Sequence, residues 1–157
     1  MSVSRTADSY AYQAIYNCLM ADAALIELFD GNAPQISWKM PVRQASMPFI
    51  VFYSKMHDAV KFPYQKEGRI YFSVYDYSQS TTRSDQIVSR ICSLLRMRGF
   101  PSIPGIISGM RIFQNSMIDS MPTDSETVLR YDISFPAKWC DELGMLEKLT
   151  RTFPQIS

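Results

Sequence analysis

The chain has 157 residues, of which 46% are hydrophobic and 20% are charged, as expected for one globular domain and not for a disordered chain. Sixteen Lys and Arg against fifteen Asp and Glu leave a formal net charge of +1, without the one-sided basic surface that tight nucleic-acid binding requires. Residues 1–8 lack the apolar segment of a signal peptide, and the densest apolar stretch, residues 49–53, is too short to cross a bilayer. We therefore expect neither secretion by that route nor a membrane span.

The first predicted element is a helix from about residue 9 to about residue 28. Its apolar side chains recur at spacings of three and four and share one face: Tyr12, Ile15, Tyr16, Leu19, Ala23 and Ile26. Asp22 can act as an N-cap, so this region is either one helix or a helix followed by a short second one, ending near Gly31.

Three strands are predicted next. Residues 36–40 form a short edge strand, and residues 47–53, apolar on both alternating faces, form a central strand. We expect helices to cover one side of this strand and a neighbouring subunit the other. After a charged connection over residues 55–68, the strand 69–77 places two sets of side chains on opposite faces: Ile70, Phe72 and Val74 on one, and Tyr71, Tyr75 and Tyr77 on the other.

The clearest helix follows. Thr82-x-x-Asp85 resembles a capping box that opens it, and Gly99 is its expected stop. One stripe is apolar, with Ile87, Val88, Ile91, Cys92 and Leu95, and the opposite face is expected to be solvated, with Ser84, Ser89, Arg90, Ser93 and Arg96.

The last third of the chain predicts a proline-stiffened connector at residues 100–105 and two strands, 110–118 and 128–139, joined as a hairpin. Apolar and polar residues alternate along the second strand, which indicates a sheet buried on one face. A short helix follows. The fold class is therefore α+β, a mainly antiparallel sheet of four to five strands backed by two helices, with one domain over residues 1–139 and a C-terminal extension over 140–157.

The residues that carry chemistry are sparse. The single histidine, His57, is predicted in the charged connection, and no serine lies in a Gly-x-Ser-x-Gly elbow. Cys18, Cys92 and Cys140 are too scattered for a zinc site or a disulfide framework, and we expect buried free thiols. No glycine-rich phosphate loop is present. The sequence predicts no enzyme, no metal and no cofactor.

Two binding hypotheses stay open. Arg69 with the tyrosines of strand 69–77 resembles, weakly, the face of a small RNA- or single-strand-binding module, and exposure of those tyrosines would favour that alternative. Four cations lie in or beside the charged connection and either line a channel around passing DNA or belong to a solvated loop: Lys55, Lys61, Lys66 and Arg69.

An ordered series of segments points to a family. It runs from Ala21-Asp-Ala-Ala-Leu-Ile-Glu-Leu28 and Gly31 to Met47-Pro-Phe-Ile-Val-Phe-Tyr53 and Gly68-Arg-Ile-Tyr-Phe-Ser-Val-Tyr-Asp-Tyr77, then to the helix over 82–97 and to Leu129-Arg-Tyr-Asp-Ile-Ser-Phe135. This series, over most of residues 9–139, resembles the tail terminator or tail completion proteins of long-tailed bacteriophages. The proline-rich connector and the extension from Cys140 depart from the pattern.

The resemblance implies a structural virion protein without catalytic residues. It implies a hexameric ring that caps the tail tube at full length, binds head-completion proteins on its other side and lets DNA pass through its centre. Such a protein would lie at the tail end near the neck of the virion, and in the host cytoplasm during assembly. A head–tail connector or minor tail protein is the alternative within the same class.

Aromatic and apolar residues that one domain cannot easily bury are the candidate subunit interface. They are Phe62 and Tyr64 in the charged connection, Tyr71 and Tyr75 on the second face of strand 69–77, and Phe153 and Ile156 in the C-terminal tail.

Overall fold

Six strands and four α-helices make up the part of the chain that the computed structural model describes, residues 6–29, 34–39, 46–62, 64–123 and 125–152. The helices are α1 (Ala7–Met20), α2 (Ala23–Leu28), α3 (Thr81–Leu95) and α4 (Glu142–Thr152). The strands are β1 (Ile36–Trp38), β2 (Phe49–Asp58), β3 (Gln65–Tyr77), β4 (Ile107–Ile112), β5 (Met117–Met121) and β6 (Val128–Asp141). They form one sheet in the order β1-β2-β3-β6-β4, with β5 also paired to β6.

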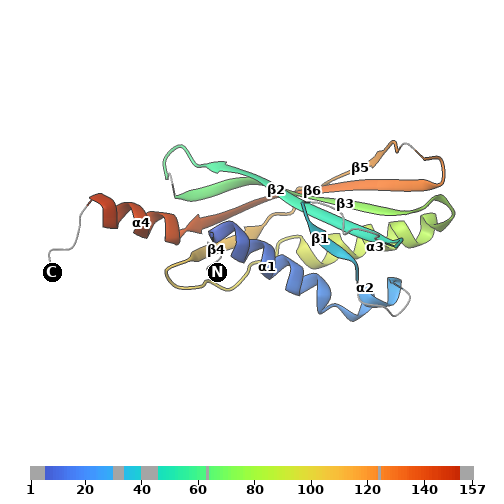
Figure 1. The fold of residues 1–157 in the computed structure, drawn as a ribbon, viewed down its shortest axis with the longest axis horizontal. Helices are drawn as coiled ribbons and strands as arrows, with labels where there is room; N and C mark the ends of the chain where they lie inside the picture. The colour runs from blue at the N-terminus through green and yellow to red at the C-terminus, as the bar shows by residue number, and fades with distance from the viewer. Residues whose placement is uncertain (1–5, 30–33, 40–45, 63, 124, 153–157) are drawn as a thin grey trace.

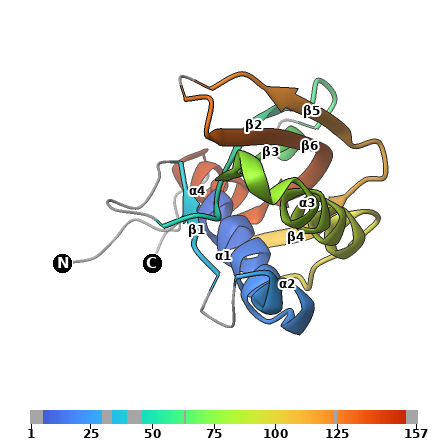
Figure 2. The ribbon, with the colours of Figure 1, turned by 90° about the vertical axis from the view of Figure 1, so that its right-hand side faces the viewer.

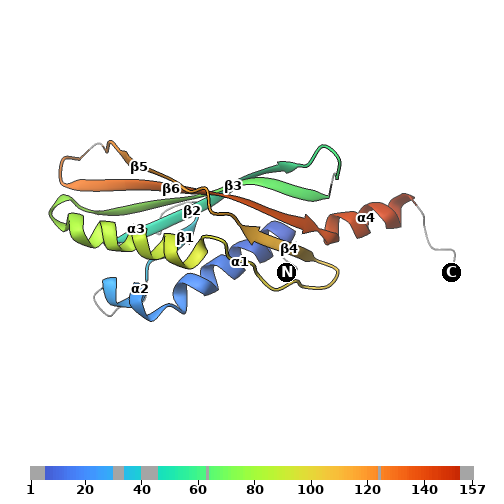
Figure 3. The ribbon, with the colours of Figure 1, turned by 180° about the vertical axis from the view of Figure 1, so that it is seen from behind.

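The predicted α+β class is confirmed, and every strand pair except β1–β2 is antiparallel. In Figures 1 and 3 the sheet lies above α1, α2 and α3, and the end view of Figure 2 shows these helices on one face only. The sheet has six strands because two short strands share one edge of β6.

The core lies between the sheet and these three helices. Alternate side chains of the long strands point toward the helices and are buried, with Phe52, Phe72 and Phe135 adjacent on β2, β3 and β6. Ile15 from α1 and Ile91 from α3 pack against them with no exposed surface. Of the alternating apolar residues of β6, Ile133 and Phe135 are fully buried as predicted, whereas Leu129 and Tyr131 are half-buried and Ser134 on the opposite face is buried as well.

Asp22 decides that the first helical region is two helices. Its carboxylate accepts the Leu25 backbone N–H at 2.9 Å and caps α2, and it also accepts two hydrogen bonds from Arg90 of α3, at 2.7 Å and 2.6 Å. The Arg90 guanidinium, with the backbone hydrogen bond, holds the pKa of Asp22 below its ordinary value. One carboxylate therefore joins the start of α2 to α3.

Replacing Asp22 with alanine is expected to lower the free energy of unfolding by about 1–2 kcal/mol, because the cap of α2 is lost. The pKa of Asp22 is lower in the folded state than in the unfolded state. The carboxylate therefore contributes fully to folding stability above the unfolded pKa, and this contribution is lost as pH falls through the folded pKa. Urea unfolding of the wild type and of Asp22→Asn between about pH 3 and pH 7 should therefore give curves that converge at the acidic end. A difference in the free energy of unfolding between the two proteins that stays constant over this pH range would contradict the prediction.

The predicted charged connection over residues 55–68 is wrong, because β2 and β3 continue through it as a hairpin. The ladder runs to Asp58 opposite Lys66, with His57 opposite Glu67, so residues that resemble a solvated loop form cross-strand pairs. Gly68 allows close approach here: a Cβ at this position would lie 2.0 Å from the carbonyl oxygen of Lys55. In Figure 1 the hairpin projects at one end of the sheet.

The predicted ends of the second long helix are also wrong. α3 begins at Thr81 after a 3₁₀ turn, Ser80 makes no side-chain cap bond, and the supposedly solvated Ser84 is buried. Asp76, at the end of β3, is fully buried and accepts hydrogen bonds from Arg83 at 2.7 Å and 2.6 Å and from the Tyr77 N–H at 2.8 Å. This ion pair ties the first turn of α3 to the sheet.

The other end of α3 differs from the prediction in its stop. The helix ends at Leu95, and Met97 adopts a positive φ of 61° two residues later. Gly99, the expected stop, instead bridges Arg111.

The predicted strand 110–118 is two strands. β4 pairs with residues 137–141 of β6 and β5 with residues 130–134 of the same edge. Pro136 lies between them, and its carbonyl accepts the Phe113 N–H at 2.9 Å toward this edge. Because proline has no N–H, a ladder donor is missing there and the pairing is interrupted. The predicted pairing of this region with the last strand is confirmed by β5 and β6.

The predicted terminal helix is α4, which follows β6 directly and extends beyond the sheet in Figures 1 and 3. Glu142 accepts the Gly105 N–H at 2.9 Å and joins its start to the loop before β4. Phe153 and Ile156, predicted interface residues, lie outside the described residues.

Candidate docking surfaces

The face of the sheet opposite the helices carries stacked aromatic rings. Phe49 and Tyr75, cross-strand partners on β2 and β3, stack with ring centroids 4.6 Å apart and 14° between planes. Tyr53 and Tyr71 stack likewise at 5.1 Å and 12°. These two pairs, with the residues between them on β2, β3 and β6, form what we call the open face.

The β6 side of the open face is polar and satisfied. Asp132 accepts hydrogen bonds from Ser73 Oγ at 2.9 Å and from Arg130 at 2.9 Å and 3.0 Å. The Arg130 guanidinium also lies 5.6 Å from the centre of the Tyr75 ring, and its hydrogen bond to Asp132 raises the pKa of Arg130. Tyr75 therefore has Phe49 on one side and a cation against its ring as well.

The open face is partly shielded by its own side chains, and its coverage by a second chain stays a prediction. Val51, Ser73 and Ser134 are each no more than 7% exposed, although no described helix lies above them. Tyr71 and Tyr75 are half-buried, with ring faces in use by their neighbours. Base stacking needs free ring faces, so this surface does not favour the single-strand-binding alternative.

The tip of the β2–β3 hairpin is apolar and exposed. Val60 is 100% exposed and Phe62 is 64% exposed, with the exposed Lys61 between them. Tyr64 is half-buried, and its carbonyl accepts the Asp141 N–H at 2.7 Å. The two predicted interface residues thus differ: Phe62 belongs to the tip, and Tyr64 joins the hairpin to the end of β6.

The four predicted cations do not share one surface. Lys55 and Arg69 are cross-strand partners on the side of the open face, and Arg69 donates to Ser134 Oγ at 3.0 Å. Lys66 is on the helix side by register and pairs with Asp58 at 2.5 Å, a bond that raises the pKa of Lys66. Lys55 and Lys61 are the exposed members.

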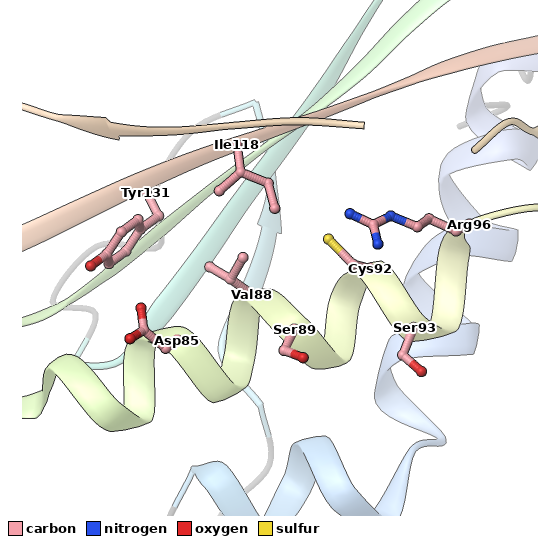
Figure 4. A pocket seen from close by; sticks show the side chains of 8 residues that line it. All are labelled: Asp85, Val88, Ser89, Cys92, Ser93, Arg96, Ile118 and Tyr131. Atoms are coloured by element: carbon pink, nitrogen blue, oxygen red, sulfur yellow. The ribbon is translucent and has the colours of Figure 1, made fainter. Parts of the chain in front are cut away.

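A groove of about 470 Å³ lies between α3 and the β5–β6 hairpin. Figure 4 shows Ile118 of β5 pointing toward Val88 of α3 at its middle, with Asp85 below Tyr131 at one end and Cys92 beside Arg96 at the other. Burial raises the pKa of Tyr131, and the adjacent Asp85 raises it further. Ile118 is 46% exposed, so its apolar surface remains accessible.

The groove and Val60 were not predicted from the sequence. Because the sequence predicts one strand over residues 110–118, it does not place Met117 and Ile118 opposite α3. A usable signal for the tip was Val60-Lys-Phe62, two large apolar residues amid charged ones.

Groups suited to catalysis or metal binding are dispersed over the described residues. His57 is exposed near the end of β2, in a strand and not in a loop as expected, with Nδ1 3.3 Å from the Asp58 carbonyl oxygen. Cys92 is buried, Cys18 and Cys140 are half-buried, and all three are free. Burial raises the pKa of the Cys18 and Cys92 thiols. Within the described ranges, no three His, Cys, Asp or Glu side chains are grouped to hold a metal, and no helix has the length and apolarity of a membrane span.

Comparisons with known proteins identify the fold. No protein-family model matches the sequence, and no curated protein matches it. A chain from a solved structure described as "Virion of native gene transfer agent (GTA) particle" is similar with a TM-score of 0.65 and 15% identity, covering 82% of this chain and 92% of that chain. A second solved protein, named only by a sequence identifier, is similar with a TM-score of 0.51 and 15% identity over 81% of this chain and 94% of that chain. At this identity the likeness shows a shared fold.

Proposed function

We propose that this chain is a structural protein of a phage-like virion, without enzymatic activity, that works by binding copies of itself and other virion proteins. The observation that carries the proposal is the fold shared with a chain of the gene transfer agent virion, which extends over 82% of this chain and 92% of that chain. The exposed apolar hairpin tip and the accessible groove supply the protein-binding surfaces that such a role needs.

Within that class, we propose the role of a tail terminator. The order of segments that resembles this family supports it, and with it a ring, hexameric by resemblance, placed between the tail tube and the head-completion proteins near the neck. The connector or minor tail protein is the alternative on the same scaffold. DNA passing through the ring would meet exposed cations such as Lys55 and Lys61, contacts that are weak and indifferent to sequence.

Replacing Phe62 and Tyr64 with alanine is expected to impair assembly, because the hairpin loses its exposed aromatic surface and an aromatic side chain at its base. Virions assembled with the variant chain and viewed by electron microscopy should show tails of irregular length or tails not joined to heads.

The matched control is Met97→Ala, which removes another exposed apolar side chain away from the hairpin and should leave assembly normal. Thermal unfolding of each variant separates misfolding from lost contacts. Tails that end at normal length and join heads normally in the Phe62/Tyr64 variant would contradict the assignment, whereas monomers in dilute solution alone would not.

A further inference from the structure

Building on the proposed self-assembly, we infer that the hairpin tip of one copy docks into the groove between α3 and β5 of the next copy. Val60 and Phe62 would lie against Val88 and Ile118, and Lys61 would lie near Asp85. The contact is between two different surfaces of the same chain.

The tip has the properties of an inserted element. Two large apolar side chains lie within three residues at the end of a projecting hairpin, and one of them is fully exposed. Exposed apolar groups at a protruding position gain most from transfer out of water, because nothing in the described part of the chain already shields them. The β2–β3 ladder ends at Asp58 and Lys66, so Val60 and Phe62 lie in the short connection that the two paired strands carry at their end.

The groove has the matching size and lining. Its volume of about 470 Å³ falls in the range of pockets that hold organic ligands, and its middle is formed by the apolar side chains of Val88 and Ile118. The charged groups, Asp85 and Arg96, lie at the two ends, and Ser89 near the middle is exposed, so an apolar group that enters beside Val88 and Ile118 displaces water without burying a charge.

Charge favours one orientation. Lys61 lies between the two apolar residues of the tip, and Asp85 is exposed at one end of the groove. Arg96, at the other end, would repel Lys61, and its guanidinium already donates to Ser116 Oγ at 2.6 Å and 2.9 Å. Opposite charges at a rim fix the register of an interface more than they add to its affinity.

The placement of the two surfaces sets the symmetry. The hairpin projects at one end of the long axis, while β5 and α3 lie toward the other end in Figures 1 and 3. A contact between two different patches of one chain is heterologous, so each bound copy presents another free tip and another free groove, and the series ends only when a ring closes. The open face is not needed for this contact.

Disulfide trapping between copies tests the inference, with Cys92→Ser in every variant because Cys92 also lines the groove. One preparation carries Phe62→Cys and another carries Ile118→Cys. Mixed at high concentration and oxidised, they should give at least ten times more covalent dimer than either alone. The matched control pairs Phe62→Cys with Ile103→Cys, an exposed apolar position outside the groove lining, and should give only background.

A charge exchange provides a second readout. Lys61→Glu should weaken assembly, measured by mass in solution and by electron microscopy of virions, and adding Asp85→Lys should restore it. Both side chains are exposed, so both variants should fold.

The outcomes separate the inference from the proposed function. A crosslink confined to the 62–118 pair, together with rescue by the exchange, supports the docking. If virions assemble but neither the 62–118 crosslink nor the rescue by charge exchange is observed, the docking is overturned and the structural role remains. If Ile118→Arg blocks assembly but no 62–118 crosslink forms, another element occupies the groove and the docking is overturned. If the chain joins neither itself nor a virion under any condition, both ideas fail.

Discussion

Replacing Arg83 with methionine is expected to lower the free energy of unfolding by about 3–5 kcal/mol, the usual cost of removing one partner of a buried ion pair. Asp76 is 0% exposed and accepts two hydrogen bonds from this guanidinium. Without it, the buried carboxyl group loses these two hydrogen bonds, and the first turn of α3 loses its contact with β3. Urea unfolding monitored by circular dichroism measures the loss.

The control is the double variant Asp76→Asn/Arg83→Met. It removes the carboxyl group that the single variant leaves without its guanidinium partner, and the asparagine oxygen can still accept the Tyr77 N–H, so it should recover at least about 1 kcal/mol relative to Arg83→Met. A single variant that loses less than about 1 kcal/mol would show that this pair does not join α3 to the sheet.

Replacing Phe72 with alanine is also expected to cost about 3–5 kcal/mol, because it opens a cavity in the core. Phe72 has no exposed surface, stacks with Phe52 at 5.6 Å and meets Phe135 edge-on at 5.9 Å. Chemical denaturation measures the difference in the free energy of unfolding between the wild type and the variant. We do not expect binding of a partner chain to restore the lost stability.

Its neighbour Tyr71 is the matched control, since it lies on the same strand but on the open face. Tyr71→Ala removes a half-buried ring and one stacking contact with Tyr53, for which we expect about 1–2 kcal/mol. Equal losses at the two positions would mean that the open face is as dry as the core, and the one-sided architecture would then be wrong as an account of stability.

The sequence predicts those helices and strands in which the spacing of apolar side chains marks the face that is buried. The spacing of apolar residues in α1 and α3 and the alternation in β6 follow directly from contact with one core, so periodicity suffices for them. It fails where a long-range partner decides the outcome. The start of α3 depends on Asp76 in a preceding strand, and the length of the hairpin depends on cross-strand pairs such as Asp58 with Lys66.

The same distinction holds for the candidate surfaces. The exposure of Phe62 could be predicted, because a large aromatic residue with charged neighbours in the sequence is expected to lie at the surface. The structure places it at an exposed tip. The contact of Tyr71 and Tyr75 with a partner chain stays a prediction, and within the chain the β2–β3 register brings each ring against another, which no local pattern encodes. Ile118 was missed because the break between β4 and β5 arises from Pro136, on a strand that follows them.

The long β3–β6 ladder has a mechanical consequence. It pairs all 13 residues of β3 with β6, and the strands run along the axis that separates the hairpin tip from the β5 end. Tension applied between those two ends acts parallel to the strands, while the hydrogen bonds of an antiparallel ladder lie across them. Such a load shears the whole ladder at once and does not peel it open bond by bond. A subunit held by its neighbours at these two ends would therefore resist pulling in the plane of a ring far better than it would resist a force that lifts one strand away from the sheet.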